Sequence, residues 1–369
     1  MSRRLLIFHP ALAPYRVDFF NLLSQAFSTE LVLFDTNLVN QKFDQQKLVG
    51  RMNCKVSYLT NGFRWKDRYF RTGALRKIWR YKPDIVLGCE YSPVTVCIAL
   101  WKLVFRSRFK LFTITDDNIG QFNARRGIKK LLRWFFVRAL DGIIVTNAET
   151  ANAYKQITPA QAKIVYPIVP ILHASSSLLA NRERVLSEAK AWREAYLKAW
   201  RKVLVFVGRL DPEKNVGWLI DRMGDVGKDI GLVLIGSGTE EDALKNSVAA
   251  AHVENVRFLG RKEGDDVYRM MAMADVLVLP SVFEPYGAVV GEALLWGTPC
   301  LVSDHVGASV LIHEGENGAV FKTGDAADFQ AKLSSLLHCE KKGKPLLEID
   351  LETAVEKLVS VMQGRGSEA

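Results

Sequence analysis

Two carboxylates in one short segment suggest binding chemistry. Residues 283–299 read FEPYGAVVGEALLWGTP and place Glu284 and Glu292 in a loop and in the helix that follows it. Pro285 predicts an irregular turn, and the apolar residues after it recur at the spacing of a buried helix face. Glu284 is therefore expected at the mouth of the helix, with Glu292 one turn inside it.

The start of that helix would form an anion site. Amides of the first helical turn have no partner within the helix, and the helix dipole adds partial positive charge there. Amides that hold a diphosphate, next to carboxylates that accept hydrogen bonds from sugar and ribose hydroxyls, would suit a sugar nucleotide. The alternative is a loop followed by a solvated acidic helix face. The candidate donor-binding residues here are Tyr286, Gly287, Ala288 and Val289.

A second cluster adds two cations. Residues 202–208, KVLVFVG, predict a buried strand, and Arg209 and Lys214 follow it directly. In an open parallel sheet, ligands bind beyond the carboxyl ends of the strands, so both cations are expected to face one crevice. Charged hydrogen bonds of this kind contribute roughly 1.5–3 kcal/mol each, enough to anchor a diphosphate without a metal. Alternatively, Arg209 pairs with Asp211 or Glu213.

A third segment repeats this plan with glycines. The apolar residues 232–235 lead into Gly236, Ser237 and Gly238, and Thr239 then opens a predicted helix as its N-cap. The glycines would allow the backbone to approach a ligand closely, although an ordinary tight turn explains the same residues.

Together these motifs resemble the retaining glycosyltransferases of family four, which have the GT-B fold. The resemblance covers roughly the carboxyl half of the chain, with the motifs in the family's order and spacing. The motifs are GRLDPEKN from Gly208, GSG from Gly236, VRFLGR at 256–261, ADVLVLPSVFEPYGAVVGEALLWGTP from Ala274, and ENGAVF from Glu316.

The resemblance implies roles for these residues. Arg209 and Lys214 would bind the donor diphosphate and stabilise its charge as the sugar leaves. Glu292 would bind the ribose, and Glu284 would contact hydroxyls of the transferred sugar. The strand end at 259–261, including Arg261, would lie against the base. The sequence differs from the family pattern at residues 309–311, where relatives often carry an acid and this chain has Ser-Val-Leu.

Length and pattern predict two α/β domains. The chain has 369 residues, and strand-like runs alternate with helical stretches, the pattern of doubly wound parallel sheets. We expect an acceptor-binding Rossmann-like domain over 1–170, a nucleotide-sugar domain over 171–348 and a cleft between them. A final helix within 349–369 would pack back on the first domain. The predicted strands are 5–8, 31–34, 85–87, 111–114, 142–145, 203–207, 232–235, 256–259, 276–279 and 300–302.

Charge is concentrated in the first domain. Residues 1–170 hold 27 Lys and Arg against 11 Asp and Glu, and the remainder holds 23 against 29. Aromatic residues and cations alternate in 63–82, 101–112 and 125–138, which suits anionic lipid head groups. Nucleic acid, or simply solvated helix faces, are the alternatives. We expect contact with an anionic membrane and no nucleic acid.

The cysteines and the hydropathy favour the cytoplasm, and peripheral attachment to the inner face of the plasma membrane is compatible with them. No apolar run reaches the roughly 20 residues that span a bilayer, and MSRRLLIF reads as a first strand and not as a signal peptide. The five cysteines form no CxxC pair and read as reduced core residues: Cys54, Cys89, Cys97, Cys300 and Cys339.

The amino half carries weaker site candidates. The loop HPALAPYR after the first strand contains His9, Tyr15 and Arg16, with Arg16 a candidate for an acceptor phosphate. Packing at the strand end is the alternative role for His9. Asp116 or Asp117, in TITDDN, would polarise the acceptor hydroxyl, with turn formation as the alternative.

The resemblance implies transfer of a hexosyl unit from a UDP- or GDP-sugar to a glycan or polyprenyl-linked acceptor, in bacterial surface-polysaccharide assembly. No cofactor and no metal are expected, because the chain lacks a D-x-D motif. A GT-B-fold sugar-nucleotide epimerase and a catalytically inactive scaffold are the competing functions.

Overall fold

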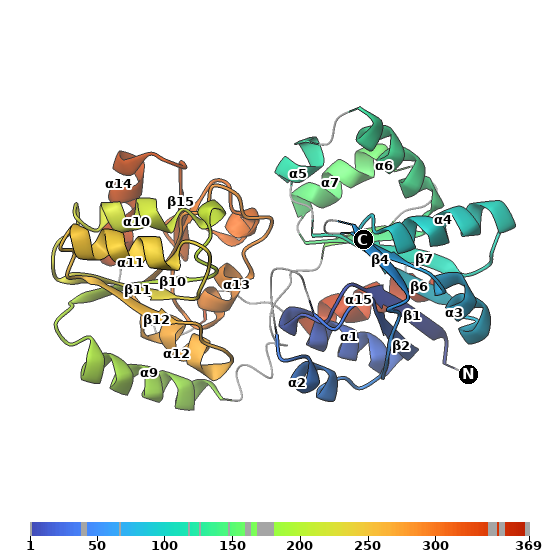
Figure 1. Ribbon diagram of the computed structural model, residues 1–369, viewed down its shortest axis with the longest axis horizontal. Coiled ribbons are helices and arrows are strands. Elements are labelled where there is room, and N and C mark those ends of the chain that lie inside the picture. Colours follow the sequence, from blue (N-terminus) through green and yellow to red (C-terminus); the bar gives the residue numbers. More distant parts are fainter. Residues whose placement is uncertain are drawn as a thin grey trace. The chain divides into compact units, whose positions relative to one another are not determined.

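The predicted strands form two parallel sheets in the computed structural model, each within a unit of its own (Figure 1). The structure describes residues 2–37, 43–65, 68–116, 119–124, 127–146, 148–158, 164–167, 181–338, 345–346 and 351–365. Unit 1 comprises Met1–Ala174 with Asp350–Ala369, and unit 2 comprises Ser175–Ile349. The predicted α/β class with doubly wound parallel sheets is confirmed.

Unit 1 has a seven-stranded sheet in the order β3-β2-β1-β6-β7-β8-β9, with all neighbours parallel, and a separate antiparallel hairpin, β4-β5. The strands are β1 (Arg4–His9), β2 (Ser28–Leu33), β3 (Lys55–Tyr58), β4 (Gly62–Trp65), β5 (Arg68–Arg71), β6 (Ile85–Cys89), β7 (Lys110–Ile114), β8 (Gly142–Val145) and β9 (Ile164–Pro167).

Helices cover both faces of this sheet. The helices are α1 (Pro14–Ala26), α2 (Gln45–Gly50), α3 (Ala74–Tyr81), α4 (Pro93–Phe105), α5 (Ile119–Ala124), α6 (Ile128–Ala139), α7 (Ala148–Ile157) and α15 (Leu351–Gln363). Alternate strand residues such as Leu6, Phe8 and Val86 form one core with α3, α4, α6 and α7. The last helix, α15, contacts α1 within the same unit.

Unit 2 has a six-stranded parallel sheet in the order β12-β11-β10-β13-β14-β15. Figure 1 shows α10, α11 and α14 on one face of it and α9 and α12 on the other. The strands are β10 (Lys202–Val207), β11 (Ile230–Ile235), β12 (Val256–Gly260), β13 (Val276–Leu279), β14 (Cys300–Ser303) and β15 (Gly318–Phe321). The helices are α9 (Arg182–Tyr196), α10 (Val216–Arg222), α11 (Glu241–Ala250), α12 (Asp265–Met273), α13 (Ala288–Leu295) and α14 (Ala326–His338), with 3-10 turns Pro212–Lys214 and Gly307–Leu311.

The strand order in unit 2 reverses between β10 and β13. From β10 the chain proceeds outward to β11 and β12, then returns to β13 on the other side and proceeds to β14 and β15. Loops that leave β10 and β13 therefore diverge at their carboxyl ends and open a crevice, which is the usual ligand position in open α/β sheets. This reversal decides which of the predicted residues come together.

The cysteines are not all core residues. Cys89 and Cys300 are buried and Cys54 is half-buried, whereas Cys97 is exposed on α4; all four are free thiols. Cys339 lies outside the described residues. The prediction of a core cysteine at 97 was wrong because α4 turns one apolar side to the surface. Among the described residues, no helix is both long and apolar enough to span a bilayer.

Candidate donor site

Arg209 follows β10 directly, at the strand-order reversal of unit 2. Its guanidinium is bound by two carboxylates: Nη1 donates to Asp211, and Nη2 donates to Oε1 of Glu213 at 2.6 Å. Pairing with these residues was the alternative interpretation of Arg209, and the structure has both pairs. Asp211 also accepts hydrogen bonds from the Thr239 amide (2.9 Å) and hydroxyl (3.1 Å).

The hydrogen bonds around Asp211 hold it in its ionised form. Burial acts to raise the pKa of this carboxyl, but the bonds from Thr239 and the charge of Arg209 outweigh burial and lower it. The contact with Thr239 corrects one prediction. Thr239 does not cap α11, whose N-cap is Glu240, because its hydroxyl is taken up by Asp211.

Lys214 and Glu284 join the loops that leave β10 and β13. The Lys214 ammonium donates to Oε2 of Glu284, and each side chain is only 12% exposed. The backbone holds the same geometry, since Val282 donates its amide to the carbonyl oxygen of Glu213 at 3.0 Å. The backbone carbonyl oxygen of Glu284 in turn accepts a hydrogen bond from the amide of Gly307 at 3.0 Å. Gly307 lies after β14. The structure thus brings together Lys214, which is predicted to bind the diphosphate, and Glu284, which is predicted to bind the sugar.

Glu292 lies where the sequence places it, in the second turn of α13, and its side chain is buried at 3% exposure. Burial alone raises the pKa of this carboxyl from 4.5 to about 8. At neutral pH the buried carboxyl is therefore mostly protonated, which avoids the desolvation of a charge. A neutral carboxyl both donates and accepts a hydrogen bond, which matches a sugar hydroxyl.

The helix α13 begins as predicted. Its N-cap is Gly287 in the left-handed region at φ 90°, and Ala288 and Val289 form the first turn, whose amides have no partner inside the helix. Tyr286 is buried just before it, and its carbonyl oxygen accepts from the Ala308 amide at 2.6 Å.

The Gly236-Ser237-Gly238 turn packs on the loop that carries Arg209. A Cβ at Gly236 would overlap the carbonyl oxygen of Gly208, and one at Gly238 would overlap the backbone of Leu210. Leu210 donates its amide to the carbonyl oxygen of Ser237 at 3.0 Å. The close approach that the glycines allow is therefore an approach of backbone to backbone, which fixes the position of Arg209.

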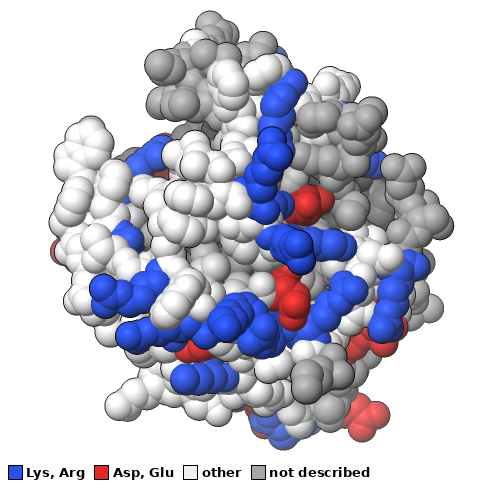
Figure 2. All heavy atoms as spheres, turned by 90° about the vertical axis from the view of Figure 1, so that its right-hand side faces the viewer, with Lys and Arg blue, Asp and Glu red and all other residues white. Residues whose placement is uncertain are grey.

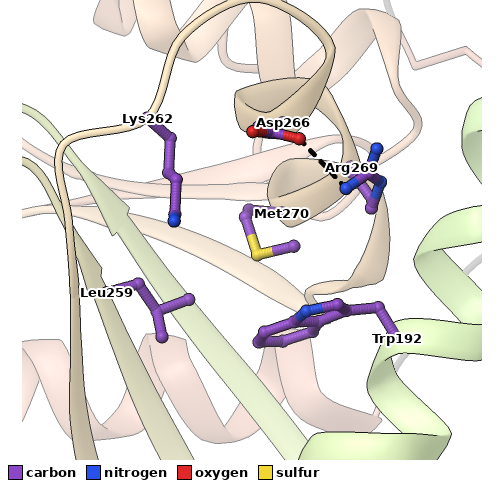
Figure 3. Close-up of a pocket in the computed structure, with 6 residues that line it drawn as sticks. All are labelled: Trp192, Leu259, Lys262, Asp266, Arg269 and Met270. Atoms are coloured by element: carbon purple, nitrogen blue, oxygen red, sulfur yellow. Dashed lines mark hydrogen bonds and ion pairs between the residues drawn. The ribbon is translucent and has the colours of Figure 1, made fainter.

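Arg261 follows the edge strand β12 and pairs with Glu263 at 2.6 Å. Beside this strand end lies a pocket of about 120 Å³, which sequence reasoning missed because its lining comes from three separate elements (Figure 3). Trp192 of α9, Leu259 of β12 and Met270 of α12 form its apolar lining, and Lys262, Asp266 and Arg269 are its charged members.

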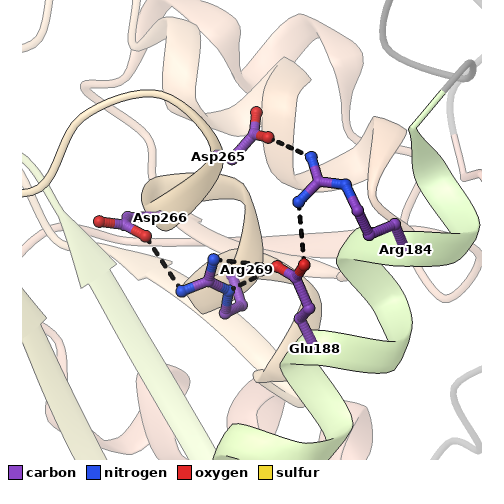
Figure 4. A network of polar contacts seen from close by, with 5 residues as sticks. All are labelled: Arg184, Glu188, Asp265, Asp266 and Arg269. Atoms are coloured by element: carbon purple, nitrogen blue, oxygen red, sulfur yellow. Dashed lines mark hydrogen bonds and ion pairs between the residues drawn. The ribbon is translucent and has the colours of Figure 1, made fainter.

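An ion-pair network next to this pocket ties α9 to α12 (Figure 4). Glu188 accepts from Arg184 at 2.9 Å and from Arg269 at 2.9 Å, Arg269 also pairs with Asp266 at 3.0 Å, and Arg184 pairs with Asp265. The pairs hold the amino end of α12 against α9, and hence the loop that supplies Lys262. The adjacent acids Asp265 and Asp266 each pair with an arginine.

The unit 1 candidates gather at the carboxyl end of its own sheet. Arg16 is buried on α1, and its Nη2 donates to Oδ1 of Asp116, after β7, at 2.5 Å. The ion pair neutralises both charges, and the assignment of Arg16 to an acceptor phosphate stays a prediction. The Arg16 guanidinium also lies 5.2 Å from the centre of the Tyr15 ring. Asp117 lies outside the described residues.

His9 is buried at the end of β1 and is neutral. Its Nδ1–H donates to the carbonyl oxygen of Ala11 at 2.8 Å, and burial, with the charge of Arg16, lowers the pKa of the imidazole to about 4. The ring also packs edge-on against Phe20. Packing at the strand end, the alternative role for His9, is thus present in the structure.

Comparison with known proteins identifies a family domain in this part of the chain. Residues 189–348 match the family model described as glycosyl transferases group 1. The chain carries a glycosyl transferases group 1 domain. That domain contains Arg209, Lys214, Glu284 and Glu292, and the predicted family resemblance is confirmed.

Proteins similar to this chain include the N-acetyl-alpha-D-glucosaminyl L-malate synthase of Bacillus anthracis, 27% identical over 74% of this chain and 71% of that protein. The phosphatidyl-myo-inositol mannosyltransferase of Mycobacterium leprae is 34% identical over 37% of each chain. The match spans less than two thirds of the first curated relatives, between 31% and 59% of their lengths.

Among solved structures, Anabaena Alr3699/HepE in complex with UDP is similar over 98% of this chain and 95% of that one, with a TM-score of 0.71 and 17% identity. At this identity the likeness concerns the fold, and it supports the predicted GT-B fold.

Proposed function

We propose that this chain is a retaining hexosyltransferase. It would move a sugar from a UDP- or GDP-sugar to a glycan or polyprenyl-linked saccharide, in polysaccharide biosynthesis, without a metal. The observation that carries the proposal is the ion pair between Lys214 and Glu284. It joins the loop after β10, which also carries Arg209, to the loop after β13 at the strand-order reversal of unit 2. A sugar nucleotide presents the complementary groups, namely a diphosphate and hydroxyls.

The ion pairs of the site suggest how the donor binds. The diphosphate would take the place of the carboxylates on Arg209 and Lys214, and the first-turn amides of α13 would donate hydrogen bonds to its remaining oxygens. Glu284, separated from Lys214, would then turn to the sugar hydroxyls. Glu292 would bind the ribose as a neutral acid.

Transfer would proceed by front-face attack, with the acceptor oxygen bonding to the anomeric carbon on the face that the diphosphate leaves. The sugar–phosphate bond breaks as that bond forms, and the acceptor proton passes toward the departing phosphate oxygen. Arg209 and Lys214 would stabilise the charge that develops on the diphosphate, an electrostatic effect that is stronger in the transition state than in the ground state. Asp116 of unit 1 remains the candidate to polarise the acceptor hydroxyl.

Relatives support the donor and acceptor classes. A solved neighbour binds UDP, and one curated relative is named as a phosphatidyl-myo-inositol mannosyltransferase, a name that pairs a hexose with a lipid-linked acceptor. We therefore propose a lipid-linked acceptor and a reaction in the cytoplasm, at the inner face of the plasma membrane.

The first test is a thermal-shift panel of UDP, GDP, ADP and their sugars without metal. A ligand that binds only the native state at a hundredfold excess over Kd stabilises it by about 2.7 kcal/mol. A shift with UDP or GDP that is lost in Lys214→Ala is the expected result. A shift with neither would reject the donor site and favour the inactive scaffold.

Product analysis distinguishes the proposed glycosyltransferase from a GT-B-fold sugar-nucleotide epimerase. With donor and no acceptor, an epimerase converts the sugar of the nucleotide, whereas a transferase yields at most slow hydrolysis. Conversion of the donor sugar in the absence of acceptor would replace the proposed function by the epimerase.

A further inference from the structure

Unit 1 carries an apolar surface that its own fold leaves uncovered. On α4, Leu100, Leu103, Val104 and Phe105 are all more than half exposed, and Val104 reaches 71%. Cys97, Leu100 and Val104 follow the i, i+3, i+7 spacing of one helix face, while Val94, Ile98 and Ala99 fill the core from the opposite face. The helix thus has two apolar faces, and only one of them is buried in unit 1.

Neighbouring elements extend this surface. Helix α6, which contacts α4, exposes Trp134 and Phe135, and these residues together with Leu100, Leu103, Val104 and Phe105 are called the apolar ridge below. Exposed aromatic residues flank the ridge at Trp79 on α3 and at Phe63 and Trp65 on β4. Unit 2 has nothing similar among its described residues, where the exposed large apolar side chains are only Tyr196, Val282, Phe283 and Val310.

Cations surround the ridge. Residues 62–108 contain eleven Lys and Arg but only three Asp and Glu. Figure 2 shows Lys and Arg gathered in a band across this side of unit 1, with few acidic side chains among them. Arg76 and Arg80 on α3, and Arg106 and Arg108 after α4, are exposed and form no ion pair with a described carboxylate. These four residues are called the basic collar below.

From this surface we infer that unit 1 docks on an anionic phospholipid bilayer, with the apolar ridge inserted at the head-group boundary and the basic collar on the lipid phosphates. Aliphatic side chains at the centre with cations and Trp at the edge match the layers of such an interface. A nucleic acid would stack on aromatic rings and leave Leu100, Leu103 and Val104 in water. The inference deepens the lipid-linked acceptor of the proposed function, but it depends only on this surface.

The test is co-sedimentation of the full chain with phosphatidylglycerol–phosphatidylethanolamine vesicles, with phosphatidylcholine vesicles for comparison. Binding should require phosphatidylglycerol. Leu100→Asp/Val104→Asp should weaken it about tenfold or more, because two inserted side chains become anions. Arg76→Glu/Arg80→Glu should have a similar effect, since about 1 kcal/mol is lost per cation at an anionic surface, a roughly fivefold change in affinity for each.

The matched controls lie in unit 2. Tyr196→Asp removes an equally exposed apolar side chain and Lys190→Glu reverses an exposed cation on α9, and both should leave vesicle binding unchanged. Circular dichroism and the nucleotide thermal shift show that each variant is folded.

Four outcomes would overturn the inference. They are no binding to the anionic vesicles, equal binding to phosphatidylcholine, binding that ignores Leu100→Asp/Val104→Asp, and a wild-type dimer that this double variant makes monomeric, which would assign the ridge to a second copy. Because vesicle binding needs no sugar nucleotide and the thermal shift needs no vesicle, failure here is distinguishable from failure of the proposed function.

Discussion

Glu292→Gln should stabilise the unligated protein, although it alters a predicted ligand of the donor. The carboxyl is buried, and its pKa is raised from 4.5 to about 8 by the loss of hydration. The native state therefore retains a proton that the unfolded chain releases as the pH passes 4.5. Stability that is present below pH 4.5 is lost progressively as the pH rises to about 8. Glutamine does not titrate, so the free energy of unfolding of the variant does not fall with pH in this way.

The magnitude follows from the size of the shift. Each pKa unit corresponds to about 1.4 kcal/mol, so the variant should exceed the wild type by on the order of 1 kcal/mol at pH 5, 3 at pH 7 and 5 at pH 9, apart from a constant offset. For a domain of about 150–250 residues, 1 kcal/mol moves Tm by roughly 2–4 °C. The gap in Tm between variant and wild type should therefore widen by about 8–16 °C from pH 5 to pH 9.

Calorimetry at several pH values measures this gap through the unfolding transition of unit 2. Glu254→Gln, at an exposed position in the same unit, is the matched control and should follow the wild type at every pH. A gap between Glu292→Gln and wild type that stays constant from pH 5 to pH 9 would show that Glu292 is ionised in the fold, and the argument from burial would then be refuted.

Three further outcomes are expected. Lys214→Ala should lower kcat by on the order of a hundredfold while raising donor KM less, and a larger effect on KM in steady-state assays would contradict a role at the leaving diphosphate. EDTA should leave transfer intact, and substantial loss that a divalent cation restores would reject the metal-free mechanism. Gly236→Ala should lower the free energy of unfolding by about 2 kcal/mol or more, because its Cβ meets the Gly208 carbonyl oxygen. Gly260→Ala, with φ 65° but open space around the new Cβ, should lower it by only about 1–2 kcal/mol. Equal losses in denaturant unfolding would show that backbone strain at positive φ, and not the overlap, sets the cost.

The sequence predicts the central strands well because they are buried on both faces. The predicted run 142–145 is β8 and 276–279 is β13, residue for residue. A strand covered by helices on both sides must be apolar throughout, so it stands out from its flanks. The hairpin β4-β5 was missed for the opposite reason, since FRW and RYF mix arginine with exposed aromatic residues and bury only Tyr69.

The site residues are predictable in type but not in pairing. Motif residues identify Lys214 and Glu284, but they lie 70 positions apart, and only the return of the chain from β12 to β13 brings them into one ion pair. Arg16 and Asp116 are 100 positions apart and meet for the same topological reason, in unit 1. Local sequence also misassigned Thr239, because the capping pattern carries no sign of the more distant Asp211 that takes its hydroxyl.

The pairing itself explains how a site built for an anion remains stable when no anion is bound. Two cations without partners in one short loop would repel each other and destabilise that loop. Asp211 and Glu213 neutralise Arg209, and Glu284 neutralises Lys214, so the unligated loops are held in place by their own ion pairs. The three carboxylates already exceed the two cations by one charge, and burial keeps the carboxyl of Glu292 protonated, so that it adds no further negative charge. When the donor binds, its diphosphate would replace the carboxylates as the partner of the same two cations. The ion pairs therefore hold the cations in place before the donor arrives. Electrostatic stabilisation of a leaving group depends on such preorganisation.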